Sequence, residues 1–549
     1  SLVFRMRLAS FTGVLLAVAP SLAAADEYIW PSRYDELEDI LSLQSGYLGR
    51  NFSSAVTPCT QGGNVKGRQN AAEWIRSAFH DMITHDSALG TGGLDGSIWF
   101  ELDRAENGAL AFENTFNFFA YLHSLRASAA DLLAMSVIVS HSGCGGTTKI
   151  PFMAGRVDAK GAGPAGVPET DTPLGTMLER FATAGYSQED MITLVACGHT
   201  LGGVHSHDHP DIVPGESGDR YNDTVVKFDT TDGEFDNAVA VEYLSDNTQN
   251  PLVVGKNETK NSDKRIFSSD NNATISRLAR DNAEFEKTCA EIFERMIDTV
   301  PSTVELSQPI EPIDIKPYIT DLYLNDNGKL VFSGRIRVRT TEGAAAGRLA
   351  SDLDLQVHHA VRNKRWSCAR INTTYVGNAQ GLYGETFAWY EFGMELNATK
   401  GISKFNIETT VRSTGERILY DNGGEGYPVT DTLLYQRADS CVARQAVNGT
   451  RAMEATVAVR KDQASRPLRL ELARYTKMTG LVVREWEVET VPFENTGETR
   501  GEDGGWVVFK APTRLKTASW LTWFDIIQEG DDGERIEFLK TEACPRTSS

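Results

Sequence analysis

Hydrophobic residues recur at helical spacing through the first half of the chain. Between residues 31 and 300 most apolar positions lie three or four residues apart, and Gly-, Asp- and Pro-rich stretches separate these runs. The helices that this pattern predicts span residues 33–43, 70–83, 112–126, 129–140, 172–184, 188–196, 275–281 and 282–299. Pro301, Pro309, Pro312 and Pro317 then follow in quick succession, which is typical of a linker or a domain boundary. The pattern therefore predicts a mostly α first domain.

Beyond these prolines the hydrophobic period changes from helical to alternating. Residues 329–339, 454–460 and 481–488 alternate polar and apolar side chains, and Gly, Asn and Asp turns separate many short runs of this kind. The second half is thus predicted to be all-β, with one or two β-sandwich-like domains. The tetrapeptide Gly-Glu-Arg-Ile at 415–418 recurs at 533–536, a weak trace of an internal repeat.

Length and charge narrow the class of protein. A chain of 549 residues is too long for one ordinary core, so two or three domains are expected. We expect an α domain at 26–305 and β-rich regions at 306–445 and 446–549, as two domains or one unit. The formal net charge of -21 argues against nucleic-acid partners and against anionic membrane surfaces.

The N-terminus has the pattern of a secretory signal peptide. Arg5 and Arg7 precede the apolar run Leu8–Leu22, and small residues at 23–25 would allow cleavage before Asp26. That run is too short to cross a membrane, and no later run reaches about 18 apolar residues. We therefore expect residues 1–25 to be removed and the protein to be secreted and glycosylated. Its Asn-x-Ser/Thr sequons are at Asn51, Asn222, Asn257, Asn272, Asn372, Asn397 and Asn448.

The stretch Trp74–Asp81 is the first candidate for chemistry. On a helix Arg76 and His80 are four residues apart, so both side chains point to the same side. A fixed cation beside an imidazole suits proton transfer to a substrate that develops negative charge. Taken alone, the two residues are better explained as side chains on a solvated helix face.

A second stretch, Leu194–Gly203, places His199 among small and apolar residues that can pack against a flat cofactor. The two stretches together resemble the secreted fungal haem peroxidases of the plant peroxidase superfamily, of the lignin and manganese peroxidase type. The resemblance covers roughly residues 26–300 and includes, in order, the motifs at 93–98, 128–134, 150–159 and 228–236. It implies a mostly α haem-peroxidase domain that binds haem b and reduces hydrogen peroxide with small one-electron donors.

The resemblance also assigns roles on the distal side of the haem. His80 would be the general base and Arg76 would stabilise the charge that develops as the O–O bond breaks. Phe79 would pack near the haem and restrict the pocket. Asn107 matches the residue that accepts a hydrogen bond from the distal histidine.

On the proximal side His199 matches the ligand of the haem iron. Asp270 matches the carboxylate that binds the outer nitrogen of this histidine and increases its anionic character. Phe228 stands where intracellular cytochrome c and ascorbate peroxidases have Trp, and a phenyl ring is hard to oxidise.

Two calcium sites are implied by the same resemblance. Carboxylate, hydroxyl and carbonyl oxygens suit a hard cation. The distal set comprises Asp81, Gly93 (carbonyl), Asp95 and Ser97. The proximal set comprises Thr200, Asp229, Thr231, Glu234 (carbonyl) and Asp236.

Seven cysteines cannot all pair within one chain. The resemblance joins Cys59 to Cys144. Cys197, two residues before His199, is expected to be a buried free thiol. A pairing of Cys368 with Cys441 is our expectation for the second half, and it leaves Cys289 and Cys544.

Departures from the family bear on the donor. Manganese-oxidising members present three carboxylates where this chain has Gln69, Glu73 and His205, and lignin-oxidising members have a Trp where this chain has Leu194. We therefore expect a generic peroxidase of small phenolic or aromatic donors. The histidines at 205, 207 and 209 suit either a borderline metal or a solvated loop, and we favour the loop.

Two alternatives stay open. In one, the protein binds a wall polysaccharide or a protein partner through its β-rich half, and the haem domain is vestigial. In the other, the donor preference is of the ascorbate or cytochrome c type, which Phe228 and the calcium ligands disfavour.

Overall fold

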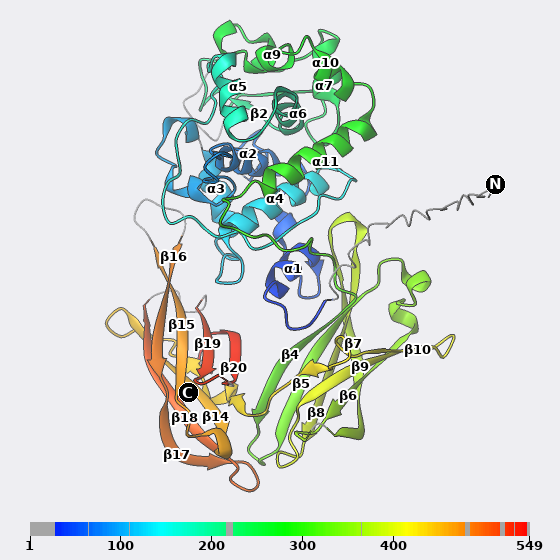
Figure 1. Cartoon of the computed structure of the whole chain (residues 1–549), viewed down its shortest axis with the longest axis vertical. Coiled ribbons are helices and arrows are strands. Elements are labelled where there is room, and N and C mark those ends of the chain that lie inside the picture. The colour runs from blue at the N-terminus through cyan, green and yellow to red at the C-terminus, as the bar shows by residue number, and fades with distance from the viewer. Residues whose placement is uncertain are drawn as a thin grey trace, which may run out of the picture.

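A helical half and a β-rich half lie one above the other (Figure 1). The computed structural model describes residues 28–63, 65–108, 110–215, 223–363, 365–477, 484–516, 522–531 and 533–545. The signal peptide predicted for residues 1–25 and the sequon at Asn222 lie outside these ranges. Within them, no helix is long and apolar enough to cross a membrane. The predicted division into an α domain and an all-β region is confirmed.

One helix at the centre of the helical half organises the others. Ala129–Gly143 (α4) is buried almost throughout because its residues are apolar on all faces, and Ser128 caps it by accepting the N–H of Asp131. The distal helix is α2 (Asn70–Met82) and the proximal helix is α6 (Gln188–Gly198), which begins with a capping box at Ser187. The remaining helices are α1 (Asp35–Ser42), α3 (Leu110–Phe119), α5 (Leu174–Thr183), α7 (Ala238–Leu244), α8 (Pro251–Val254), α9 (Ser262–Phe267), α10 (Ala273–Leu278) and α11 (Asn282–Asp298).

Two features of this half differ from the predicted elements. The helix expected over 112–126 ends at Phe119, whose carbonyl oxygen accepts both the Leu122 and the His123 N–H and so closes a turn. Helices α7, α8 and α9 have four to seven residues each, too few to produce a readable period. A short strand pair, β2 (Gly203–His205) with β3 (Val225–Lys227), follows the proximal helix.

The first β unit is a sandwich with a core that includes Phe332, Phe392 and Phe405. Its strands are ordered β10-β9-β6-β7-β8-β5-β4, with β1 against β7 and β11 against β9. The first part of β7 pairs with β6 and the last part with β8, so this long strand joins the two layers. The strands are β1 (Ser45–Gly46), β4 (Ile315–Leu324), β5 (Leu330–Arg339), β6 (Leu353–Ala360), β7 (Trp366–Gln380), β8 (Thr386–Leu396), β9 (Lys404–Val411), β10 (Arg417–Tyr420) and β11 (Tyr427–Pro428).

The second β unit packs a sheet ordered β12-β14-β18-β17, with β13 beside β14, against a sheet ordered β16-β15-β19-β20. Both β12 and β13 precede residue 446, the predicted boundary, yet they pair with β14. The two Gly-Glu-Arg-Ile repeats each lead into a strand at a sheet edge, β10 and β20. The strands are β12 (Leu433–Tyr435), β13 (Cys441–Val442), β14 (Thr450–Arg460), β15 (Leu468–Lys477), β16 (Arg484–Pro492), β17 (Glu494–Arg500), β18 (Trp506–Lys516), β19 (Trp523–Gln528) and β20 (Arg535–Lys540).

Three disulfides cross-link the described part of the chain, and two of them correct our expectations. Cys59 pairs with Cys144 as the resemblance implies. The prediction that Cys197 is a free thiol is wrong, because α11 packs against α6 and brings Cys289 to a Cα separation of 5.5 Å. The prediction of a Cys368–Cys441 bridge is also wrong, because the chain beyond β20 returns beside β13 and Cys441 pairs with Cys544.

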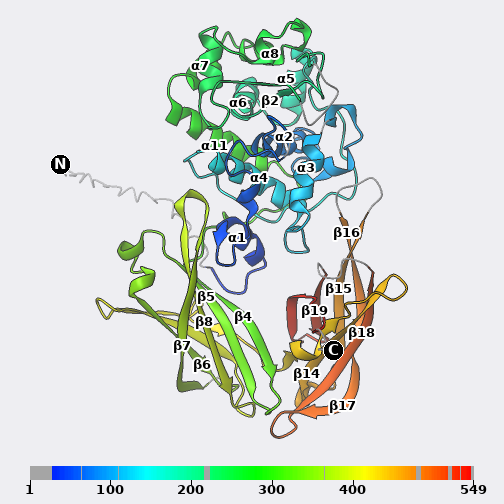
Figure 2. The same cartoon turned by 180° about the vertical axis from the view of Figure 1, so that it is seen from behind.

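The N-terminal segment is fixed to the first β unit, and α1 lies between the two halves in both views (Figures 1 and 2). Strand β1 pairs with the end of β7. Helix α1 contributes Glu38 and Asp39 to a buried group of charges with Lys316 and Arg337, here named the interdomain ion cluster. The Lys316 ammonium is 2.9 Å from Glu38 and 3.0 Å from Asp39, and the Arg337 guanidinium is 3.0 Å from Asp39. Burial of all four side chains makes this contact specific and sensitive to the loss of any partner.

Candidate functional site

The distal helix presents Arg76 and His80 one turn apart, as the sequence predicts. The His80 Nδ1–H donates to Asn107 Oδ1 at 2.9 Å, and the Asn107 amide donates in turn to the Glu101 carbonyl at 3.2 Å. This second bond fixes the orientation of the amide, so its oxygen faces the histidine. His80 Nε2 therefore keeps its lone pair and is available as a base.

Burial sets the charge state of this pair. His80 is buried, and desolvation together with the nearby Arg76 lowers its pKa to about 3. The imidazole is thus neutral even in acidic solution. The Phe112 ring lies 4.9 Å from the His80 ring and also 4.9 Å from the Arg76 guanidinium, so it holds both groups on one side. The Phe79 ring lies 6.0 Å from His80, which agrees with a packing role.

His199 directly follows the proximal helix and has a partner that the sequence did not identify. Its Nδ1 is 2.8 Å from Asp263 Oδ2, a carboxylate that is completely buried. Asn250 and Ser262 donate to the same carboxylate at 2.8 and 3.2 Å. The Phe228 ring stacks on His199 at 4.2 Å. Because Nδ1 is occupied, Nε2 is the nitrogen free to bind a metal, and the side chain is 31% exposed despite its buried neighbours.

The assignment of Asp270 to this role is therefore wrong. Asp270 accepts the N–H groups of Ala273 and Thr274 and the Thr274 hydroxyl, so it caps α10 instead. Asp263 lies within the short helix α9, and Asp270, seven residues later, precedes the short helix α10. What distinguishes them is that Asp263 lies on the buried face of α9. The sequence does not show which face of this six-residue helix is buried.

The residues predicted to bind a distal calcium ion lie together, with Asp81 in the last turn of α2 and the others in the segment 93–97. Asp81 accepts the N–H groups of Asp95, Gly96 and Ile98 through its two oxygens. The Gly93 carbonyl accepts the Asp95 N–H, and the Ser97 hydroxyl lies 3.4 Å from Asp81. Burial and its neighbour Asp95 raise the pKa of Asp81 well above its usual range. The buried Asp81 carboxylate lies beside the partly buried Asp95 carboxylate, and a cation would relieve the repulsion between them.

The predicted proximal set also converges. The Thr200 hydroxyl donates to the Asp236 carbonyl at 2.6 Å, and the Thr231 hydroxyl donates to the Asp236 carboxylate at 2.9 Å. Asp229 is buried, and one of its oxygens has no hydrogen-bond partner among the described atoms. A buried carboxylate oxygen without a partner can be satisfied by a bound ion or a water molecule. The Glu234 N–H bonds to the Thr231 carbonyl, which shapes the turn. No three His, Cys, Asp or Glu side chains of the described ranges form a metal cage by themselves.

The positions that bind manganese in the resembled family are engaged with protein groups. Glu73 forms a short ion pair with Arg68. Gln69 accepts the Gly202 N–H at 2.7 Å and donates to the Asp232 carbonyl at 2.7 Å. His205 lies 2.9 Å from the Asp223 carboxylate. Of the buried polar atoms in these side chains, only the second Glu73 oxygen, Oε2, has no hydrogen-bond partner among the described atoms.

The prediction of a solvated loop for the three neighbouring histidines needs correction at one position. His205 is not in a loop, because it belongs to β2 and pairs with Val225. His207 contacts the adjacent Asp208 at 3.0 Å. Burial lowers the pKa of His209. Leu194 is buried in α6, so it offers no surface side chain.

Comparison with known proteins agrees with this geometry. Residues 60–284 match the family model for peroxidase. The chain is 39% identical to a WSC domain-containing protein of Arthroderma benhamiae over 398 residues, which is 71% of this chain and 54% of that protein. It is 34% identical to L-ascorbate peroxidase 5, peroxisomal, of Arabidopsis thaliana over 143 residues, 26% of this chain and 50% of that protein. It is 30% identical to versatile peroxidase VPS1 of Pleurotus eryngii over 196 residues, 33% of this chain and 49% of that protein.

The matches differ in how much of this chain they include, 71% for the first relative and 26% and 33% for the two peroxidases. The chain spans about half the length of each of these relatives. The 398-residue match is longer than the whole segment that precedes β4 at Ile315, so it includes part of the β-rich half. The matches to the two peroxidases are shorter, at 143 and 196 residues, and the family model covers the segment that carries the distal and proximal histidines. Residues 60–284 are therefore a domain of the peroxidase family.

Proposed function

We propose that the chain is a secreted haem peroxidase that reduces hydrogen peroxide with one-electron oxidation of small phenolic or aromatic donors. The observation that supports it best is a pair of oriented histidines. His80 is held by Asn107 and His199 by Asp263, each through Nδ1, so both present Nε2. A base on one side and a metal ligand on the other are what this reaction needs.

Haem b fits the residues between the two helices. The exposed part of the His199 ring provides a ligand nitrogen, and the Asp263 carboxylate increases its donor strength. The Phe228 ring, stacked on His199, offers an apolar surface to a flat macrocycle. When bound, haem iron would supply the centre that accepts oxidising equivalents from hydrogen peroxide.

The distal residues would move one proton and stabilise one charge. His80 Nε2 takes the proton from one oxygen of hydrogen peroxide and returns it to the other oxygen, which leaves as water. The Arg76 guanidinium, positively charged and partly buried, stabilises the negative charge on that leaving oxygen. Two phenol molecules then each give up one electron and one proton, so one hydrogen peroxide and two phenols yield two water molecules and two phenoxyl radicals.

The donor preference is inferred from two side chains, a Glu73 carboxylate that is already paired and a Phe at position 228 in place of Trp. A manganese(II) ion needs anionic oxygens, and Glu73 is already neutralised by Arg68. Phe228 and not Trp stacks on His199, which disfavours a protein-based oxidised site of the cytochrome c type. We therefore infer small donors and poor manganese oxidation.

Two calcium ions belong to the same proposal. The proximal set, with its orphaned Asp229 oxygen, supports a cation more strongly than the distal set. In the distal set the Asp81 oxygens already accept backbone N–H groups, so a cation would share them. Each predicted set begins at the residue after a histidine, since Asp81 follows His80 and Thr200 follows His199.

Secretion is supported by the N-terminal pattern and by sequons on the surface. Of the described sequons, Asn51, Asn257, Asn372, Asn397 and Asn448 are exposed. A polysaccharide or protein contact through the β-rich half stays a prediction. The alternative in which that half is the only working module is not favoured, because the distal and proximal sets are complete.

Two variants test the proposal. His199→Ala should lose stable haem, whereas His80→Leu should keep haem and react with peroxide ~10²–10⁴-fold more slowly, the usual range for a lost general base. The measurements are the Soret band after reconstitution and stopped-flow reaction with peroxide. Wild-type haem retention in the His199 variant, or a wild-type rate in the His80 variant, would contradict the assigned roles.

A further inference from the structure

One turn of the peroxidase domain, residues 123–127, contacts the second β unit and is here named the docking turn. Ser124 and Ala127 exchange backbone hydrogen bonds of 3.1 and 3.2 Å, and these close the turn. The Arg126 guanidinium lies 5.1 Å from the centre of the Phe538 ring and 2.7 Å from the Glu537 carboxylate, both on β20. Strand β16 of the same unit extends toward the helical half in both views (Figures 1 and 2). A cation–π contact and an ion pair on one arginine make this contact specific.

The backbone of Phe538 is strained at this contact. Its φ is +60°, a left-handed conformation that is rare for a bulky residue and costs free energy. The Asp525 carboxylate accepts the Phe538 N–H at 2.6 Å, and the Phe538 ring stacks on Trp523 with ring centroids 4.1 Å apart. The register between β19 and β20 shifts beside this residue, so the strand departs from regular pairing where Phe538 meets Arg126. Strain of this kind persists only where surrounding contacts hold it.

His123, the first residue of the docking turn, contacts both halves of the molecule. Its buried ring lies 5.8 Å from the Trp486 ring of β16 and 5.5 Å from the Trp99 ring of the peroxidase domain. Its Nε2–H donates to the Asp158 carboxylate at 3.1 Å. Both aromatic contacts are edge-to-face, the arrangement that ring quadrupoles favour. The position of Trp486 therefore bears directly on a side chain that holds Trp99 and Asp158.

Trp99 and Asp158 are both attached to the distal segment, residues 93–99, which carries three of the predicted distal calcium ligands. Trp99 belongs to the short 3₁₀ helix Ser97–Phe100 within this segment. Asp158 accepts two N–H groups at the start of α4, and the next residue, Ala159, donates its N–H to the Asp95 carbonyl at 2.8 Å. The second β unit thus reaches the predicted cation ligands through two sets of direct contacts.

We propose that docking of the second β unit on residues 123–127 sets the cation affinity of the distal segment, with His123 as the positioning residue. The coupling rests on the calcium site of the proposed function and deepens that function. Without Trp486 the cation has to order a looser segment, and this ordering opposes binding. By linkage, a bound cation strengthens the docking by the same factor. Because an aromatic pair contributes a limited free energy, the factor carried by Trp486 is ~2–10-fold.

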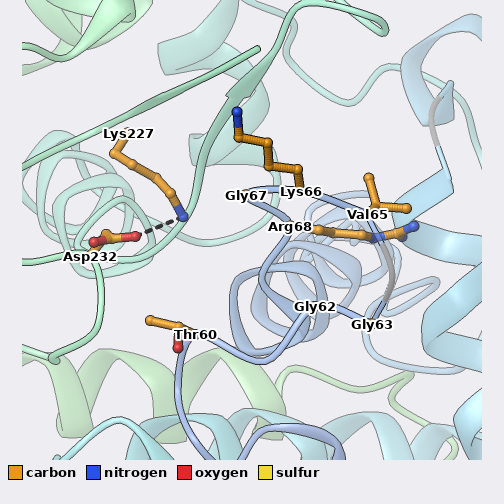
Figure 3. A pocket seen from close by; sticks show the side chains of 9 residues that line it. All are labelled: Thr60, Gly62, Gly63, Val65, Lys66, Gly67, Arg68, Lys227 and Asp232. Carbon is orange, nitrogen blue, oxygen red and sulfur yellow. Dashed lines mark ion pairs between the residues drawn. The ribbon is translucent and has the colours of Figure 1, made fainter. Parts of the chain in front are cut away.

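The first test is hydrogen exchange of the full-length protein in the presence of a chelator. Trp486→Ala should speed exchange of the amides at 94–98 by ~2–10-fold, and Trp486→Phe, which keeps a ring, should restore slow exchange. Arg126→Gln breaks the docking from the other side and should act in the same direction. Two controls should match wild type. Val488→Ala replaces a 50% exposed side chain on the same strand, and Lys66→Gln replaces an exposed side chain at the hollow beside the start of the distal helix (Figure 3).

The second test is titration of the same full-length proteins with terbium(III), a hard cation that takes oxygen ligands and whose emission Trp99 can sensitise. Trp486→Ala should weaken the distal site ~2–10-fold and leave the proximal site, identified with Asp229→Asn, unchanged. Unchanged exchange at 94–98, an equal effect of Val488→Ala, or faster exchange with wild-type terbium affinity would each overturn the coupling. Absence of distal terbium binding in wild type would refute the calcium site itself, and the coupling with it. Neither test needs donor turnover, so each outcome is separate from failure of the peroxidase reaction.

Discussion

Replacing Asp263 with Asn tests the proximal pair most directly. The carboxylate accepts from His199, Asn250 and Ser262 and is completely buried, so the substitution removes a charge without changing shape. A hydrogen bond to a charged group contributes about 1.5–3 kcal/mol. Loss of an outer partner of a metal-binding histidine typically costs ~10–100-fold, or about 1.4–2.8 kcal/mol. The two estimates agree, so Asp263→Asn should weaken haem binding or slow the peroxide reaction ~10–100-fold.

The matched control is Asp270→Asn, seven residues away. Its amide oxygen can still accept from the start of α10, so only a cap is weakened, by ~1 kcal/mol or less, and haem affinity should not change. The assays are haem titration of the apoprotein, stopped-flow reaction with peroxide and thermal unfolding of the apoprotein. The reasoning fails if Asp270→Asn weakens haem as much as Asp263→Asn, or if Asp263→Asn lowers only the melting temperature.

Four further outcomes are expected. Burial lowers the pKa of His141 to about 4, so in acid the unfolded chain binds a proton that the folded chain does not. The free energy of unfolding should therefore fall by up to ~3 kcal/mol from pH 6.5 toward pH 4. In urea unfolding, His141→Leu should make this free energy less dependent on pH across the range, and unchanged acid sensitivity would argue against the assignment. Arg337→Met should cost about 3–5 kcal/mol in unfolding free energy because it leaves Glu38 buried with less compensation, whereas the exposed Arg417→Met should change little. A chelator should release calcium detectable by elemental analysis and lower the melting temperature, and calcium-free purified protein would refute both sites. Manganese(II) oxidation should be weak in wild type and unaffected by Glu73→Ala, and efficient Glu73-dependent turnover would show that the ion pair with the neighbouring arginine opens.

The distal half of the site was predictable because its geometry is local. Arg76 and His80 are four residues apart on one helix, and helical periodicity alone places them together. Asn107 needed the resemblance, and its bond to His80 was correctly anticipated. The same holds for Cys59 and Cys144, whose pairing the resemblance supplied.

The proximal half depends on contacts between distant helices. Asp263 reaches His199 across 64 residues from a six-residue helix that has no readable period. Cys197 pairs with Cys289 because α11 packs against α6. The spacing of residues in the sequence does not predict that these two helices are in contact. In the β half, alternation indicated strands but not their partners, so the Cys441–Cys544 bridge was missed. Local pattern thus gave element type, and long-range packing decided which side chains meet.

The N-terminal segment has a consequence for the order in which the protein can be assembled. Gly46 pairs with Ala379, and the Trp30 backbone exchanges hydrogen bonds with the Asn422 side chain 392 residues later. During synthesis the N-terminal segment therefore leaves the ribosome long before the residues that it pairs with have been made. A fragment ending near residue 305 would retain Glu38 without its counter-ions and Trp30 without its aromatic neighbours. The two halves are thus co-dependent in biogenesis, and the peroxidase segment should be produced with its β-rich half rather than as an isolated module.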